Sequence, residues 1–346
     1  DVASAMTVDP AGNVYVTGLT DSSDFPVTPG AYRPAAPPTG PRELRGASFV
    51  VKLNANGTLG YATYFASSES NPTAIAVDRA GSAYLTGTSL GGLPVTPGAY
   101  QPVCSCGFVS NGFFSVPTLD GFVAHFDATG SKLLYATYLG APSSVGMTIA
   151  TALAVAPDGS AYVGASSGVY WLNPSGSGLL GHTPAKVAVE AMALGPDGSL
   201  YVAGEAWGGP DGFQPTAGAA QPDPRILPAL PYQYVVDRQS ALVKMDGQLQ
   251  GPLAATYFGG SYPNSILSLA IDPSGNVLVG GSTAPRGLPT AAPLALGFGS
   301  PSTGFAAELS GDLSTIRFSS YFGDAENFGV RGVAEMPIAI MALPRL

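Results

Sequence analysis

The sequence predicts an all-β protein made of five copies of one four-stranded antiparallel unit. Three observations support this fold class. A turn phrase of the type Asp-Pro-x-Gly-Asn recurs between short apolar runs, a second phrase with a Tyr-Ala-Thr-Tyr strand follows it, and two successive copies, at Tyr162 and Tyr201, are only 39 residues apart. Self-similarity of this length is the sequence signature of repeat architectures.

The first phrase predicts two strands joined by a tight turn. Proline fixes φ and glycine supplies a positive φ, so Pro-x-Gly-Asn forms a hairpin turn. The flanking runs alternate or are continuously apolar, as strands are. The five copies are Val8–Gly18, Val77–Gly87, Val155–Gly164, Leu194–Gly204 and Ile271–Gly280. Turn chemistry therefore explains the aspartates Asp9, Asp78 and Asp272.

The second phrase predicts the third and fourth strands of each unit. It pairs an apolar strand with a Tyr-Ala-Thr-Tyr-like strand across a short polar turn. The long copies are Phe49–Phe65, Phe122–Leu139, Ala241–Phe258 and Phe305–Phe322. The third copy is compact, with Val169–Leu172 followed by Asn-Pro-Ser-Gly.

Two hairpins in each unit give the four strands of a propeller blade. The 39-residue spacing is close to the blade length of about 40–45 residues, and radial packing protects the sheet edges. We predict a β-propeller with repeats at about 1–66, 67–140, 141–184, 185–260 and 261–323. Residues 324–346 are apolar and predict a closing strand or part of a further blade, so five blades are favoured and six are the alternative. A solenoid ranks second, because it has no place for long insertions.

These phrases resemble the SBBP family of bacterial β-propeller repeats. The resemblance covers about residues 5–323 and also rests on Phe25–Tyr32 and its copy Leu93–Tyr100. It implies the propeller fold and a secreted or cell-surface setting, but no shared activity and no catalytic motif. The third repeat lacks the Pro-Val-Thr-Pro-Gly segment, and the fifth departs from it at Leu288–Ala292.

Composition excludes several classes of partner. The net charge is −9 and charged residues make up only 11% of the chain. Without a basic stripe to neutralise phosphates, binding of nucleic acid is not expected. No apolar run reaches the roughly 18–20 residues of a membrane span, so membrane insertion is not expected either.

The placement of the long links predicts a binding face. In four repeats the link between the second and third strands is long: Leu19–Ala47, Thr88–Asp120, Glu205–Gln239 and Ser282–Thr303. In a propeller these links emerge on one face, and loops on a rigid scaffold carry binding residues. The candidate ligand-binding residues are Phe113, Phe114, Trp207, Phe213, Tyr232 and Tyr234. Tyr32 and Tyr100 recur with the repeat and are expected to pin their loops onto their own blades.

No catalytic residue and no metal ligand is assigned from the sequence. The two histidines, His125 and His182, are too few for a multi-histidine metal site, and a Ser-His-Asp triad is not expected. His125 shares its repeat position with lysines and a glutamate, so it is expected to face solvent. Cys104 and Cys106 are either two loop thiols or one local disulfide, and such a pair alone is no four-ligand zinc site.

Acidic pairs in the loops leave Ca²⁺ as the one cofactor worth considering. The pairs are Asp21 with Asp24, Glu205 with Asp211, Asp223 with Asp237, and Asp324 with Glu326. None shows the dense Asp-x-Asp-x-Asp-Gly register of a calcium loop. We therefore expect no cofactor, with Ca²⁺ as the alternative.

The sequence as a whole predicts a secreted or cell-surface module that binds or scaffolds protein or carbohydrate and is more an adaptor than an enzyme. Self-association is a further option, because the tail is apolar. One alternative is a structural subunit of an extracellular filament or surface assembly. The other is a secreted hydrolase or lyase that uses carboxylates near the propeller axis.

Overall fold

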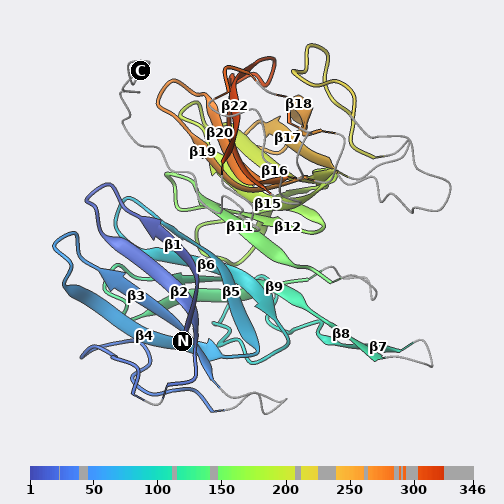
Figure 1. The fold of residues 1–346 in the computed structure, drawn as a ribbon. Coiled ribbons are helices and arrows are strands. Elements are labelled where there is room, and N and C mark those ends of the chain that lie inside the picture. The colour runs from blue at the N-terminus through green and yellow to red at the C-terminus, as the bar shows by residue number, and fades with distance from the viewer. Residues whose placement is uncertain are drawn as a thin grey trace. The chain divides into compact units, whose positions relative to one another are not determined.

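The computed structural model describes residues 1–22, 24–38, 46–110, 115–140, 147–206, 212–224, 239–260, 264–283, 288–289, 291–293 and 303–322. In these ranges the chain forms strands β1 to β22 and turns (Figure 1). No helix in this part of the chain is long and apolar enough to cross a membrane.

Five four-stranded antiparallel sheets contain all the described strands except β7 and β8. The first sheet consists of β1 (Val2–Val8), β2 (Val14–Thr20), β3 (Ala47–Leu53) and β4 (Leu59–Ser67). The second consists of β5 (Ser70–Val77), β6 (Ala83–Ser89), β9 (Asp120–Phe126) and β10 (Leu133–Leu139). The third consists of β11 (Ala150–Val155), β12 (Ala161–Ala165), β13 (Gly168–Leu172) and β14 (Leu179–Thr183).

The fourth sheet consists of β15 (Val187–Leu194), β16 (Leu200–Ala206), β17 (Gln239–Met245) and β18 (Pro252–Phe258). The fifth consists of β19 (Asn264–Ile271), β20 (Val277–Thr283), β21 (Thr303–Leu309) and β22 (Ile316–Phe322). In each sheet the strands are neighbours in chain order. The all-β class and the four-stranded antiparallel repeat are thus confirmed.

The chain divides into two compact units, which are described separately. One comprises Asp1–Leu194 with Asp246–Gly251, and the other comprises Gly195–Met245 with Pro252–Leu346. The tail at 324–346 lies outside the described residues, so its predicted role as a closing strand stays a prediction.

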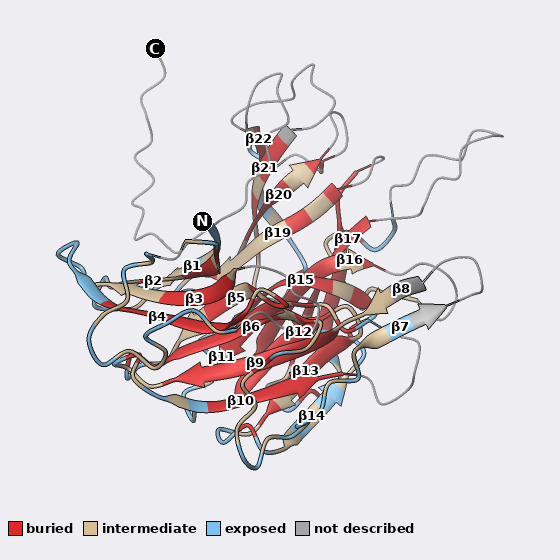
Figure 2. Ribbon diagram, turned by 90° about the horizontal axis from the view of Figure 1, so that it is seen from below, coloured by how far each residue is buried: buried red, intermediate tan, exposed pale blue. Residues whose placement is uncertain are grey.

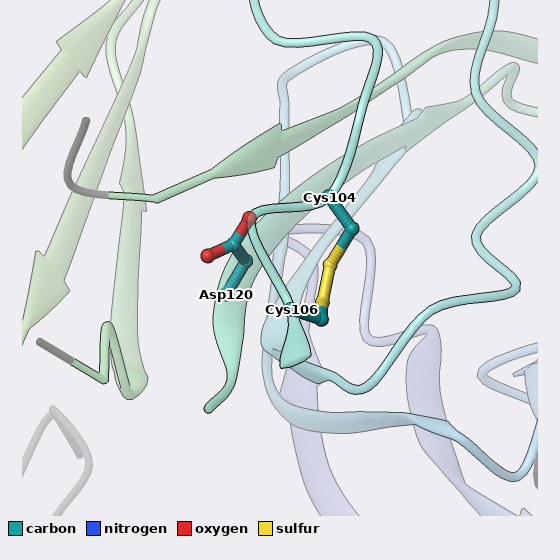
Figure 3. Close-up of side chains that lie close together, drawn as sticks. All are labelled: Cys104, Cys106 and Asp120. Carbon is teal, nitrogen blue, oxygen red and sulfur yellow. A yellow bond between two sulfur atoms is a disulfide. The ribbon is translucent and has the colours of Figure 1, made fainter. Parts of the chain in front are cut away.

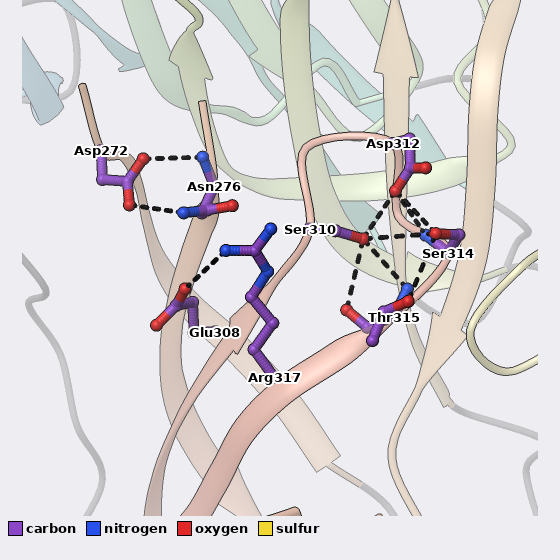
Figure 4. A network of polar contacts seen from close by, with 8 residues as sticks. All are labelled: Asp272, Asn276, Glu308, Ser310, Asp312, Ser314, Thr315 and Arg317. Atoms are coloured by element: carbon purple, nitrogen blue, oxygen red, sulfur yellow. Dashed lines mark hydrogen bonds and ion pairs between the residues drawn. The ribbon is translucent and has the colours of Figure 1, made fainter. Parts of the chain in front are cut away.

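The turns between first and second strands use the predicted aspartate chemistry. Asp9 Oδ1 accepts hydrogen bonds from the N–H groups of Ala11 and Asn13, both at 2.9 Å. In the fifth sheet the main-chain and side-chain N–H groups of Asn276 donate to Asp272 at 2.7 and 2.8 Å (Figure 4). Burial raises the pKa of Asp9 and Asp272, but these bonds outweigh it and hold each pKa below its usual value. Both side chains therefore stabilise their turns as ionised carboxylates.

The turns between third and fourth strands share one backbone feature. Their fourth residue has a positive φ in every sheet: Gly57 (82°), Gly130 (66°), Gly176 (66°), Leu249 (57°) and Leu313 (58°). Left-handed backbone favours glycine, and leucine there costs about 1–2 kcal/mol. The two leucines therefore need a reason, which the packing between sheets supplies.

Aromatic residues of one sheet pack against the glycine turns of the next sheet. A Cβ added at Gly130 would lie 2.3 Å from the Tyr61 ring, and one added at Gly176 would lie 2.3 Å from the Tyr135 ring. Tyr61 and Tyr135 hold the same position, because each pairs with the matching residue of the neighbouring strand, Lys52 or His125. A glycine is therefore required wherever the preceding sheet offers a tyrosine here.

Leucine replaces that glycine where the preceding sheet has a small residue. Gly181 holds the Tyr61 position in the third sheet, and a Cβ there would lie 3.8 Å from Leu249. Ala254 holds it in the fourth sheet, and both Ala254 and the turn residue Leu313 are buried. At these two junctions the turn carries the large side chain and the preceding strand carries the small one.

A tyrosine on the second strand also ties each of the first four sheets to a turn that follows. Tyr15 Oη donates to Gly81 O at 3.2 Å, and Tyr84 Oη donates to Gly159 O at 3.3 Å. Tyr201 Oη donates to Gly311 O at 2.8 Å, and Tyr162 Oη donates to Gly247 O. In the first unit these contacts border two clusters of buried apolar side chains, one from the first and second sheets and one from the second and third. Figure 2 shows that much of β3, β6 and β9 is buried.

The recurring Pro-Val-Thr-Pro-Gly-Ala loop covers the edge of the fourth strand. Thr28 exchanges two hydrogen bonds with Ala62, from Thr28 N to Ala62 O and from Ala62 N to Thr28 Oγ1, each at 3.1 Å. Thr96 and Ala136 pair in the same way in the second sheet. Covering an edge in this manner blocks its pairing with another chain.

The same loop reaches the following sheet. Tyr32 N donates to Gly130 O and Tyr100 N donates to Gly176 O, both at 2.9 Å. The Tyr32 ring also meets Phe126 edge-on at 5.5 Å. The predicted pinning role of these tyrosines therefore needs a correction, because they pin the loop to the next sheet as well as to their own.

Candidate functional site

The long links all leave the sheets at the same end, where the second strand finishes and the third begins. The insertion of the second sheet, residues 90–119, is the best described of them. It contains a hairpin of β7 (Gly107–Ser110) and β8 (Ser115–Thr118), which projects beyond the start of β9 (Figure 1). This insertion is the candidate functional site.

Three exposed large apolar or aromatic side chains belong to this insertion. Val103 is 73% exposed and Phe108 is 64% exposed, and Tyr100 is also on the surface. The exposed Met147 lies beside the end of the insertion, because the next residue, Thr148, donates its N–H to Leu119 O at 3.0 Å. A contiguous apolar patch on a surface marks an interaction site, and these residues are the candidates for one.

A half-buried glutamine, Gln101, anchors the base of the insertion. Gln101 Oε1 accepts from Gly140 N at 2.7 Å, and Gln101 Nε2 donates to Asp120 Oδ2 at 2.9 Å and to Val103 O at 3.1 Å. Asp120 Oδ2 also accepts from Ser105 N at 2.6 Å. The insertion is therefore held in one conformation where it leaves the sheet, which lowers the entropic cost of binding a partner.

Asp120 is the buried carboxylate of this anchor and is only 3% exposed. Burial raises its pKa, while the hydrogen bonds from Ser105 and Gln101 act in the opposite direction. Nearby, Ser70 Oγ and Ser89 Oγ lie 2.9 Å apart and are both buried. The anchor is thus a buried polar layer beneath the exposed apolar groups.

Cys104 and Cys106 form a disulfide beside Asp120 (Figure 3). Of the two readings that the sequence left open, the local disulfide is therefore the one found. The bridge closes the Cys-Ser-Cys segment whose central N–H, that of Ser105, holds the Asp120 carboxylate.

The predicted ligand-binding aromatic residues fall into two groups. Phe213 is described and is buried, at 3% exposure, with its ring 4.8 Å from that of Tyr257. Tyr257 Oη also donates to Phe213 O at 3.2 Å, so Phe213 holds its loop against β18. The side chains of Phe113, Phe114, Trp207, Tyr232 and Tyr234 lie outside the described residues.

The expectation for His125 was wrong. Its side chain is buried, at 8% exposure, and stacks on the Tyr84 ring at 3.8 Å. The reason is its cross-strand partner, Tyr84. At the matching positions the Nζ atoms of Lys52 and Lys244 lie 5.1 Å from the ring centroids of Tyr15 and Tyr201. The position is thus defined by contact with the repeat tyrosine and not by solvent.

The chemistry of His125 follows from this burial. Burial lowers its pKa to about 4, against smaller opposing effects of Asp78 and Asp127, so it is neutral at pH 7. Its Nε2 has no hydrogen-bond partner among the described residues. His182 is exposed and lies over Tyr170, with 4.4 Å between ring centroids.

The acidic pairs proposed for Ca²⁺ are only partly described. Asp21, Asp24, Glu205 and Asp223 lie in the described part, whereas Asp211, Asp237, Asp324 and Glu326 do not. Within the described part, the one group of three metal-ligating residues is Cys104, Cys106 and Asp120. The preference for Ca²⁺ in the acidic loops stays a prediction.

One family model matches two segments of the chain. The model of the SBBP beta-propeller repeat matches residues 1–26 and 60–94. These two segments are SBBP repeats. They cover the first hairpin of the first sheet and, in the second match, the strands from β4 to β6 with the start of the candidate site.

Solved structures resemble the chain only distantly. A nidogen/laminin complex shares 9% identity at a TM-score of 0.44 and covers 92% of this chain and 80% of that one. A gluconolactonase from Xanthomonas campestris shares 16% sequence identity at a TM-score of 0.30, and the match covers 57% of this chain and 52% of that one. A Bacteroides caccae protein of unknown function shares 9% sequence identity at a TM-score of 0.37, and the match covers 79% of this chain and 90% of that one. No curated protein sequence matches the chain.

Proposed function

We propose that the chain is a non-catalytic binding module whose partner, a protein, docks on the insertion of the second sheet. The observation that carries the proposal is that exposed Val103 and Phe108 belong to an insertion whose base is fixed by the hydrogen bond between Gln101 and the buried Asp120. A rigid base beneath exposed apolar groups suits a protein interface, whose core is apolar. Phe113 and Phe114, which lie between β7 and β8 in the sequence, stay predicted contacts of the same partner. A glycan partner is the second choice, since its stacking would use the same aromatic residues.

We also propose that the five sheets are blades of one propeller over residues 1–323, in a secreted or cell-surface protein. The common strand order of the sheets and the SBBP repeats support this assignment. Trp207, Tyr232 and Tyr234, from the long link of the fourth repeat, stay predicted contacts of the partner.

The variants Val103→Asp and Phe108→Asp should weaken partner binding without unfolding the chain. We expect at least about tenfold weaker binding on protein and glycan arrays, because interface hot spots contribute about 2 kcal/mol or more. Aspartate at Leu134 or Leu253, which are exposed elsewhere, is the matched control. Equal loss in all four variants, or none in any, would contradict the proposal. Turnover of an arrayed glycan would favour the hydrolase alternative.

One observation favours the filament alternative. The strand β1 exposes Val2, Met6 and Val8, three large apolar side chains. Apolar exposed strands recruit further copies of a chain. Light scattering of the purified chain should then show a mass that rises with concentration and falls in the Met6→Glu variant. Repeating it with EDTA tests the acidic loops, because bound Ca²⁺ would make the mass or the stability sensitive to the chelator.

A further inference from the structure

The disulfide of Cys104 and Cys106 lies near the carboxylate of Asp120 (Figure 3). The two sulfur atoms and one carboxylate oxygen of Asp120 all lie within 4.8 Å of one another. Tetrahedral Zn²⁺ holds sulfur at about 2.3 Å and oxygen at about 2.0–2.2 Å, so its ligand atoms lie about 3.5 Å apart. Small shifts of the segment around Ser105 would place all three atoms around one ion.

The carboxylate is already oriented by groups that would not be ligands. Ser105 N and Gln101 Nε2 both donate to Oδ2 of Asp120, at 2.6 and 2.9 Å. The carboxylate also packs against Gly140, since an added Cβ there would lie 2.4 Å from Oδ1 and 2.7 Å from Oδ2. Hydrogen bonds of this kind fix ligating carboxylates and typically change metal affinity by about 10–100-fold.

The fourth sheet contains the same support without the ligands. Gln221 is the counterpart of Gln101: its Oε1 accepts from Gly259 N at 3.2 Å, and its Nε2 donates to Asp223 O at 3.2 Å. The counterpart of Asp120 there is Gln239, the residue that pairs with the last residue of the second strand. The repeat therefore folds without these ligands, and the second sheet adds a carboxylate and both cysteines of the chain.

We propose that Cys104, Cys106 and Asp120 form a Zn²⁺ site that becomes available when the disulfide is reduced. A dithiol reductant supplies two electrons and two protons, breaks the Sγ–Sγ bond and becomes a disulfide itself. On binding, each thiol loses its proton to solvent and each Sγ donates an electron pair to the ion, with water in the fourth position. Two thiolates favour Zn²⁺ over Ca²⁺ or Mg²⁺, which prefer oxygen ligands.

The charge balance fits a buried site. With the disulfide closed and Asp120 ionised, the three residues carry a charge of about −1. With two thiolates, the carboxylate and Zn²⁺, the total is again about −1. Metal binding therefore adds no net charge beside a carboxylate that is 3% exposed.

Cobalt titration of the full chain tests the proposal. The disulfide is opened with a water-soluble phosphine, which is converted to its oxide with water and binds the metal weakly. We expect one Co²⁺ per reduced chain, with thiolate-to-cobalt charge-transfer absorption that Zn²⁺ abolishes, and no such signal from the oxidised chain. A reduced chain that binds no Co²⁺ or Zn²⁺ overturns the proposal.

Variants assign the ligands and the supporting residue. The double variant Cys104→Ser with Cys106→Ser should lose the charge-transfer band, and Asp120→Asn should weaken Zn²⁺ binding at least tenfold. Gln101→Ala should weaken it about tenfold, whereas its counterpart Gln221→Ala should leave it unchanged. Circular dichroism checks that each variant is folded. If Asp120→Asn binds Zn²⁺ as tightly as the parent chain, the three-ligand site is wrong.

Discussion

Alanine at Gly130 should lower the free energy of unfolding by about 3 kcal/mol. About 1 kcal/mol comes from the left-handed backbone, with φ of 66°. The rest comes from overpacking, because the new Cβ would lie 2.3 Å from the buried Tyr61 ring, and such insertions cost about 1–3 kcal/mol. Urea unfolding at pH 7 measures the change.

Gly57 supplies the matched control, because it holds the same turn position. Its φ is 82°, and a Cβ there would meet nothing within 4 Å. Gly57→Ala should therefore lose only the backbone contribution, about 1 kcal/mol. The double variant Tyr61→Ala with Gly130→Leu copies the pair of Ala254 and Leu313 and should recover part of the loss. Equal losses at Gly57 and Gly130 would show that the tyrosine contact does not restrict the turn.

His125 should make the chain less stable as the pH falls from about 6.5 to about 4. The histidine pKa is about 6.5 in the unfolded chain and about 4 in the folded chain. Above pH 6.5 both states are neutral and the stability is complete. Between pH 6.5 and pH 4 the unfolded chain binds a proton that the folded chain does not. This difference lowers the free energy of unfolding by about 3 kcal/mol over that pH range. Urea unfolding at successive pH values measures this slope.

Phenylalanine at His125 should remove that slope and keep the stacking on Tyr84. It also removes the Nε2 atom that lacks a partner among the described residues. His182→Phe is the control, because His182 is exposed and should change the slope much less. An unchanged slope in the His125→Phe chain would mean that other groups cause the acid sensitivity.

The strands and their turns could be predicted because their causes are local. Pro-x-Gly turns and alternating apolar residues specify a hairpin within about ten residues. The ends of the predicted phrases accordingly coincide with observed strand pairs, such as Val8 with Val14 and Ile271 with Val277. Even the long links were predicted at the correct end of the sheets, since they interrupt a fixed strand order.

The roles of single side chains were harder to predict, because they depend on partners in another strand or sheet. His125 was misread from its counterparts along the chain, and the deciding residue was its cross-strand neighbour Tyr84. Phe213 was taken as a loop aromatic, although it precedes Pro215-Thr216, just as Phe25 and Leu93 precede their Thr residues. That spacing is the signal that would have found it, and it also reveals a fourth copy of the loop, in which Thr216 pairs with Ala255.

The sequence pattern gave little indication of the anchor of Gln101 and Asp120. Both residues are polar and sit in a link that looks like solvent-exposed loop, with prolines and glycines around them. The burial of Asp120 and the partial burial of Gln101 depend on tertiary contacts between the loop and β10. The repeated Gln-Pro at Gln101 and Gln221 was the only hint available.

The alternation of large and small side chains between sheets also restricts how such a chain can change by recombination. Loss of the third repeat would place Tyr135 against Leu249, two large side chains in a space built for one. Loss of the fourth repeat would instead place Gly181 against Leu313, a small residue against a large one, as in the present chain. Each repeat therefore accepts only certain neighbours, and duplications or deletions of whole repeats are viable at some junctions and not at others.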